Sequence, residues 1–277
     1  MAIRRMSVAC DGHIHLYPEY SLPAALRILA SNLPRLAGTG LPSSEPVFCA
    51  ALMAEARECR FFRRLRDRAP ADRAAFSVED AGEPAALRII QAGLPCVHVI
   101  AGRQTVTRER IEILALATDA DVPGDAGTAE TLRAIRDAGG IPVVNWAPGK
   151  WLAERGRFVR ALLEQSRPGD FLLGDTALRP ASWREPPLMR FAQDKGFGVV
   201  RGSDPLPFPG EENLLGTYGF AYEGPFDPDR PVTSIRQILA SGASAVTAAG
   251  RRCGSARALW RTLKALAAKK SANAVRR

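Results

Sequence analysis

The sequence is poor in the residues that most metal sites and disulfide frameworks need. It has three histidines and five cysteines in 277 residues. The cysteines are odd in number, scattered, and without C-x-x-C spacing, which argues against a disulfide framework and a thiolate zinc site. This usage fits a reducing compartment, so we expect a cytoplasmic protein. The cysteines are Cys10, Cys49, Cys59, Cys96 and Cys253.

Long apolar runs are also absent. No stretch reaches the roughly 18 apolar residues that a membrane-spanning helix needs. The basic start of the chain is not followed by the apolar region or the cleavage site of a signal peptide. With 46% hydrophobic and 24% charged residues, the chain can bury a full core, and we expect a soluble, folded protein.

Acidic residues are missing from the last 27 positions. Residues 251–277 carry nine lysines and arginines and no aspartate or glutamate. The rest of the chain holds 29 basic and 29 acidic residues, so the net charge of +9 belongs to this end alone. A neutral body is not typical of a nucleic-acid-binding fold. Charge therefore gives no evidence that the body binds nucleic acid.

Apolar segments and helical patterns alternate along the chain. This alternation favours an α/β fold with a parallel sheet, either a barrel or an open doubly wound form. No internal repeat or linker interrupts it, so we expect one domain at 1–250 and a basic helix and tail at 251–277. Strands are expected at 6–10, 47–52, 86–90, 96–100, 111–117, 141–144, 171–174 and 198–201, and helices at 23–36, 54–67, 128–138, 152–165, 187–194, 232–240 and 255–269.

The strongest candidate site is Asp11-x-His13-x-His15, at the end of the first expected strand. Residues two apart on a strand point to the same side, so the three side chains can converge. Imidazole and carboxylate groups are good ligands for zinc, manganese or iron. The alternative is that they are ordinary hydrogen-bonding residues. The third histidine, His98, lies inside an expected strand and is interpreted as structural.

Polar residues follow several later strands. In α/β barrels the carboxyl ends of strands gather on one face, so Asp204 is expected to meet the histidine pair there, unless it only caps a turn. Asn145 and Lys150 could bind a polar ligand beside Trp146 and Trp151, which could instead simply pack. Arg179 is a candidate for a carboxylate or phosphate.

In this order the motifs resemble the polymerase-and-histidinol-phosphatase (PHP) superfamily of metal-dependent phosphoesterases. The resemblance covers roughly residues 6–220 and implies a distorted (β/α) TIM-like barrel. His13 and His15 match the opening H-x-H of that family, and 202–204 match its closing Gly-Ser-Asp. The segment 139–146 is similar to a Gly-Gly-hydrophobic stretch before a histidine, and the loop 216–219 also resembles the family.

The sequence departs from the family at several ligand positions. Asn145 or Trp146 stands where a histidine is expected, Leu206 replaces the last histidine, and Gly102-Arg103-Gln104 replaces a Gly-x-Glu motif. Three histidines are too few to provide the ligands for the two or three metal ions that the resemblance implies. We therefore expect at most one divalent ion (Zn, Mn or Fe).

The ligands expected for that single ion are Asp11, His13, His15 and Asp204, with Asp175 or Gln104 as further donors. Asp204 or Asp11 would act as the general base, and Lys150 would neutralise the charge of an anionic substrate. Four further residues are expected to bind that substrate: Arg103, Asn145, Arg179 and Arg201.

These observations predict a metal-dependent hydrolase, most plausibly a phosphoesterase for a small anionic substrate. The alternative is a non-catalytic PHP-like barrel that binds a polar or phosphorylated ligand.

In the last helix, Leu259, Leu263 and Leu266 form a stripe expected to pack on the sheet, with Arg261 and Lys264 on a solvated basic face. Attachment of that helix to anionic lipid or nucleic acid is the competing interpretation.

Overall fold

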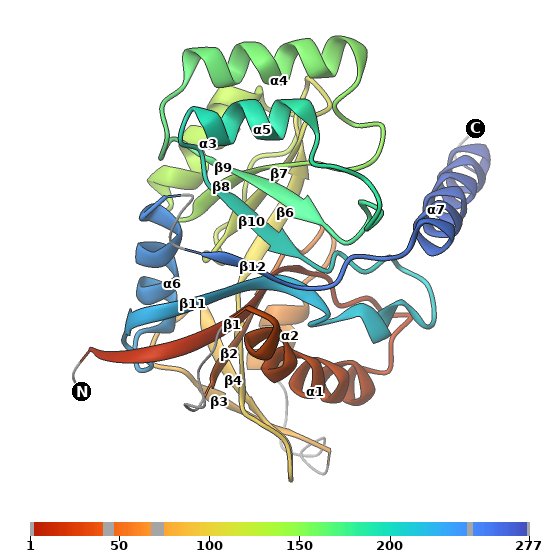
Figure 1. Ribbon diagram of the computed structural model, residues 1–277. Coiled ribbons are helices and arrows are strands. Elements are labelled where there is room, and N and C mark those ends of the chain that lie inside the picture. Colours follow the sequence, from red (N-terminus) through yellow and green to blue (C-terminus); the bar gives the residue numbers. More distant parts are fainter. Residues whose placement is uncertain (1–2, 41–46, 68–74, 243–245, 276–277) are drawn as a thin grey trace.

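The strands of the chain form two sheets (Figure 1). The computed structural model describes residues 3–40, 47–67, 75–242 and 246–275. A seven-stranded sheet has the order β12-β11-β1-β2-β5-β4-β3, and a five-stranded sheet has the order β10-β9-β8-β7-β6. The strands are β1 (Arg4–Ile14), β2 (Val47–Met53), β3 (Ser77–Asp80), β4 (Ala86–Ile90), β5 (Val97–Ile100), β6 (Gly102–Val106), β7 (Glu112–Leu116), β8 (Ile141–Asn145), β9 (Leu172–Thr176), β10 (Val199–Gly202), β11 (Tyr218–Phe226) and β12 (Thr247–Gly250).

Helices cover the outer faces of both sheets. In Figure 1, α3, α4 and α5 lie over the five-stranded sheet, α1 lies beside the seven-stranded sheet, and α7 lies at the right edge of the molecule. None of the described helices is long and apolar enough to cross a membrane. The helices are α1 (Leu22–Gly40), α2 (Phe61–Arg66), α3 (Thr128–Asp137), α4 (Ala153–Gln165), α5 (Pro187–Asp194), α6 (Pro231–Ala240) and α7 (Ser255–Val275), with a 3-10 helix at Glu211–Leu214.

Alternate side chains of the central strands enter two different cores. On β8, Val143 packs in the core between the two sheets, and Val144 packs under the helices of the five-stranded sheet. Leu172 and Leu173 of β9 divide in the same way. A strand buried on both faces needs a continuous apolar run, which is the pattern that made these strands visible in the sequence.

The sheets are mixed rather than parallel. Parallel pairing joins β1 to β2, β2 to β5, β8 to β9 and β9 to β10, whereas the other pairs are antiparallel. Strands β3, β6, β11 and β12, which the sequence did not predict, all pair antiparallel, and so do the predicted neighbours β4 with β5 and β7 with β8.

The predicted TIM-like barrel is confirmed only as an α/β architecture. Within the described residues, strand pairing does not close a barrel. Instead β10 packs against β1, and β6 approaches β2 through one isolated bridge between Glu55 and Arg103. That bridge also explains why the helix predicted from residue 54 begins only at Phe61, because Glu55 is held in extended pairing.

The C-terminal helix presents the opposite face from the one predicted. Leu259, Leu263 and Leu266 are more than half exposed, whereas Arg261 is fully buried. Arg261 Nε donates to Glu211 Oε2 at 2.8 Å, and its Nη2 donates to the Asp204 carbonyl at 2.8 Å. This ion pair and hydrogen bond give the basic side a buried anchor, so the leucine stripe faces outward.

Candidate metal centre

Two histidines and one aspartate converge where β1 and β10 end. His13 lies near the end of β1, His15 follows that strand, and Asp204 follows β10. The two Nε2 atoms lie 2.9 Å apart, and Asp204 Oδ1 lies 3.6 Å from that of His13 and 3.5 Å from that of His15. All three side chains are buried. Within the described residues they form a group that could hold a metal ion.

The close approach of β10 to β1 depends on glycine. A Cβ at Gly202 would lie 2.3 Å from the backbone nitrogen of His13, and one at Gly12 would lie 2.4 Å from Val200 Cγ1. Because neither strand carries a Cβ there, the Asp204 N–H donates to the His13 carbonyl at 2.9 Å. Asp204 itself adopts a φ of 47°, in the left-handed region that few non-glycine residues occupy. The Gly-Ser-Asp motif thus brings its carboxylate to the imidazoles.

Gly202→Ala is expected to lower the free energy of unfolding by about 1–3 kcal/mol, because the new methyl group would press on the backbone of β1. Urea denaturation followed by circular dichroism measures the change. The matched control is Gly38→Ala in α1, where an added Cβ meets nothing within 4 Å, so that helix should be unchanged or slightly stabilised. An equal stability for both variants would contradict the role given to Gly202.

The carboxylate of Asp11 lies outside the three-donor group. A bulge between Asp11 and Ile14 breaks the regular alternation of β1, so Asp11 and His13 do not face the same point. Its Oδ1 accepts from the backbone nitrogens of His13 at 3.2 Å and Ser203 at 2.9 Å, and its Oδ2 accepts from that of Gly216 at 2.9 Å. Asp11 therefore ties together the three segments that surround the site.

The electrostatics of the group suit a metal ligand set. Burial alone would raise the pKa of Asp204, but His13, His15 and Arg261 hold it well below its usual range. Burial lowers the pKa of His13, so its imidazole stays neutral at pH 7, as ligation requires. Burial raises the pKa of Asp11 to about 7, although the backbone hydrogen bonds that it accepts lower it.

The spacing of the donors fits one ion. Ligands about 2.1 Å from a tetrahedral zinc ion lie about 3.4 Å from one another. Asp204 Oδ1 lies close to this distance from the two Nε2 atoms, at 3.6 and 3.5 Å, whereas the Nε2 atoms are closer to each other, at 2.9 Å. Two imidazoles and one carboxylate leave coordination positions open for water or substrate. Gln104, which the sequence suggested as a further donor, lines the cavity beside this group.

A cavity of about 450 Å³ opens in front of this group. On its wall the Lys150 ammonium forms an ion pair with Glu112, and Asn145 Nδ2 donates to the other Glu112 oxygen at 2.6 Å. Glu112 was not singled out from the sequence, although a lone acid inside the apolar segment 111–116 was a usable signal. Side chains of α7, including Thr262 and Leu266, also line the cavity.

The predicted arginines lie elsewhere. Arg103 pairs with Glu55 at 3.2 Å and with Asp119 at 3.4 Å and lines a separate cavity. Arg179 forms a two-point ion pair with Asp175, at 2.7 and 2.5 Å. Arg179 and Arg201 line a third cavity, which contains none of the three donors. Strand order predicted one shared face, but these side chains divide among several cavities.

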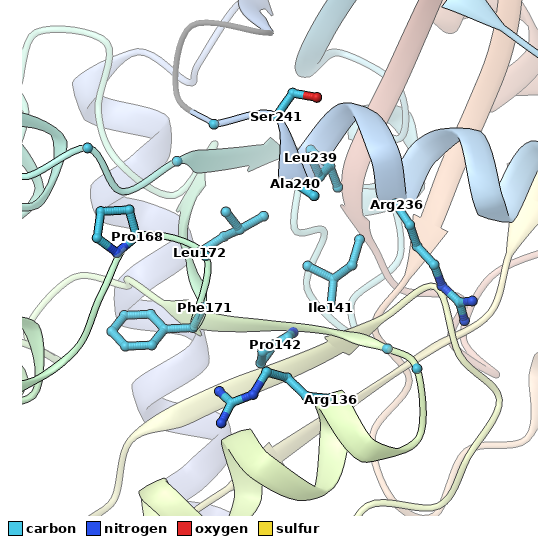
Figure 2. A pocket seen from close by; sticks show the side chains of 16 residues that line it. Arg136, Ile141, Pro142, Pro168, Phe171, Leu172, Arg236, Leu239, Ala240 and Ser241 are labelled. Atoms are coloured by element: carbon cyan, nitrogen blue, oxygen red, sulfur yellow. The ribbon is translucent and has the colours of Figure 1, made fainter.

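The third histidine and a further cavity lie away from the donors. His98 stacks on Phe48, with ring centroids 4.1 Å apart, and burial lowers its pKa to about 4. A cavity of about 420 Å³ lies at the amino ends of β8 and β9, where Ile141 and Leu172 line it with Arg136 (Figure 2). No imidazole or carboxylate lines that cavity, so it lacks the groups for metal-assisted chemistry.

Comparison with known proteins gives likeness in structure only. No family model matches the chain, and no curated protein matches its sequence. PsfC from Pseudomonas syringae PB-5123 is similar in structure with a TM-score of 0.51 and 16% identity, over 96% of this chain and 98% of that one. At this identity the likeness shows a shared fold.

Two other solved structures are similar at lower scores. A two-domain protein from Bacteroides vulgatus, containing a predicted PHP-like metal-dependent phosphoesterase, has a TM-score of 0.49 and 13% identity over 89% of this chain. The lesion-specific endonuclease PfuEndoQ from Pyrococcus furiosus has a TM-score of 0.48 and 14% identity over 88%. The chain spans only 66% and 58% of their lengths.

Proposed function

We propose that the chain is a PHP-like, metal-dependent hydrolase of the phosphoesterase class, with one divalent ion held by His13, His15 and Asp204. The observation that carries this proposal is the convergence of three buried donor atoms within 4.8 Å of one another, beside a cavity large enough for a small ester. Zinc, manganese and iron all suit this donor set.

Each side chain around the site has a distinct task. A bound divalent ion would lower the pKa of a water and polarise an ester oxygen. Lys150 places a positive charge on the cavity wall, where it can attract an anionic substrate. Glu112 positions the Lys150 ammonium through their ion pair, and Asn145 positions Glu112 by donating a hydrogen bond to it. Tyr17 also lines the cavity, and burial raises its pKa, so its hydroxyl remains a hydrogen-bond donor.

The two candidate bases have different roles in this proposal. Asp204 stays ionised because its pKa is depressed, so it is better suited to act as a metal ligand than to accept a proton. Asp11 has both oxygens occupied by backbone N–H groups and acts as a positioning residue. Proton transfer from a water would then need a base among the cavity residues, and Glu112 is the candidate that lies there.

Hydrolysis of generic esters tests the proposal. We expect protein reloaded with Zn²⁺ or Mn²⁺ to hydrolyse p-nitrophenyl phosphate or bis-p-nitrophenyl phosphate, and expect chelation to abolish the activity. Asp204→Asn should remove it, whereas His98→Gln, which loses an imidazole outside the site, should keep it.

Metal binding without turnover of either ester class would instead support the second candidate, a non-catalytic PHP-like protein that binds a polar or phosphorylated ligand. The missing family histidines favour that candidate, because Asn145 stands at one such position and bonds Glu112.

The remaining features complete the proposal. In this proposal the two sheets correspond to a distorted barrel that is not closed by strand pairing. Residues 1–250 form one domain, and the protein is cytoplasmic. The boundary at 250 marks a change of charge rather than of packing, because Arg261 is buried in the domain. The substrate is a small anion. Contact of nucleic acid or an anionic membrane with α7 is the competing proposal, and it predicts binding that weakens steeply with salt.

A further inference from the structure

The cavity lined by Arg179 and Arg201 has a volume of about 580 Å³ and lies outside the metal centre. It forms where β10 of the five-stranded sheet packs beside β11 and β12 of the other sheet (Figure 1). We call it the arginine cavity, because five arginines line it: Arg179, Arg184, Arg201, Arg251 and Arg252. The one carboxylate that lines it is that of Glu185.

The buried carboxylate of Asp175 is already engaged by one of these arginines. Asp175 accepts two hydrogen bonds from Arg179, at 2.7 and 2.5 Å. Its Oδ2 also accepts from the Tyr218 hydroxyl at 2.7 Å. The oxygens of Asp175 are therefore occupied by Arg179 and Tyr218, and its register partner Arg201 on β10 makes no ion pair with it in the described part of the chain.

Two other arginines are held in place without a counter-ion. Arg252 donates to the carbonyls of Pro180 at 3.0 Å, Trp183 at 3.2 Å and Ala181 at 3.4 Å. Arg201 is half-buried, and the one hydrogen bond of its guanidinium to the described residues goes to the carbonyl of Val199, at 3.3 Å. Neither guanidinium forms an ion pair with a carboxylate in the described part of the chain. Partly buried positive charge of this kind is costly unless an anion pairs with it.

We propose that the arginine cavity is a binding site for a phosphate-bearing small molecule, separate from the metal centre. The planar guanidinium matches the oxygens of a phosphate and binds them with paired, charge-assisted hydrogen bonds. A volume of about 580 Å³ lies in the range of small-molecule sites. Trp183, half exposed at the rim, offers a ring on which the base of a nucleotide can stack. This inference does not depend on the hydrolase.

Calorimetry on the full chain in the presence of a chelator tests the proposal, because chelation removes any binding through the metal centre. Pyrophosphate is expected to bind, and Arg201→Gln should weaken it about tenfold or more. Arg184→Gln, at an exposed position, should weaken it by less and guards against misfolding of the first variant. The matched control is Arg133→Gln, an exposed arginine on α3, which should bind as the natural protein does.

A second arm identifies the ligand. If adenosine diphosphate binds more tightly than pyrophosphate, and Trp183→Ala removes that gain in affinity, the natural ligand is a nucleotide. If the two bind equally, the ligand is a simple phosphate compound. Either result supports the proposal. No binding of pyrophosphate at millimolar concentration would overturn it. Equal weakening by Arg133→Gln and Arg201→Gln, or binding of an oligonucleotide alone, would also overturn it.

Discussion

His15→Ala is expected to weaken binding of Zn²⁺ or Mn²⁺ by more than about a hundredfold, since loss of a side chain that merely hydrogen-bonds a metal ligand already costs about 10–100-fold in affinity. The substitution removes one of three donors, and the remaining pair, His13 and Asp204, lie 3.6 Å apart without a third ligand. Competition with a chromophoric chelator measures the affinity. The ester hydrolysis proposed above should be lost at the same time.

The controls for this prediction separate ligation from folding. His98→Gln removes the remaining histidine of the chain, which stacks on Phe48 away from the donors, and it should leave metal affinity unchanged. Asp204→Asn keeps the shape of the ligand and removes its charge, so it should weaken binding as His15→Ala does. Unchanged affinity in both ligand variants, with the fold intact, would place the metal elsewhere.

Arg261→Met is expected to destabilise the protein by about 3–5 kcal/mol, because it leaves the buried Glu211 carboxylate without its cation. Glu211 is 2% exposed and accepts the Arg261 Nε–H at 2.8 Å. The same change removes the hydrogen bond to the Asp204 carbonyl. We therefore expect weaker metal binding as well as a lower free energy of unfolding in urea.

The double variant Arg261→Met and Glu211→Gln tests the reason given for that loss. Replacing both members of a buried ion pair often costs little, whereas removing one leaves an uncompensated charge. The introduced amide side chain would also retain an oxygen for the backbone N–H of Leu206, which donates to the Glu211 carboxylate at 3.2 Å. The second substitution should restore part of the stability. If the double variant is less stable than Arg261→Met, the buried charge is not the cause.

The elements that sequence predicts best are those buried on both faces. The apolar segment at 141–144 indicated β8 because a strand between two cores must be apolar throughout. Strand β6 contains Arg103, Gln104 and Thr105, and nothing local marks it as a strand. It forms because β7 offers an antiparallel partner, which is information that a single segment does not carry.

The same limit applies to the candidate site. The spacing of His13 and His15 predicted convergence correctly, because it depends only on local chain geometry. The bulge that turns Asp11 away depends on how β1 pairs with β2. The burial of Arg261 depends on Glu211, 50 positions away in the sequence. Local sequence therefore predicted a solvated basic face for the last helix, whereas Arg261 on that face is buried against Glu211.

The central claim is that two imidazoles and one carboxylate hold a single metal ion. X-ray absorption spectroscopy of the untagged protein loaded with one equivalent of Zn²⁺ tests it most directly. We expect two imidazole nitrogens and one or two oxygens at about 2.0–2.2 Å from the ion, with the imidazole signal reduced by half in His15→Ala. Coordination by oxygen alone, or a spectrum that His15→Ala leaves unchanged, would contradict the account.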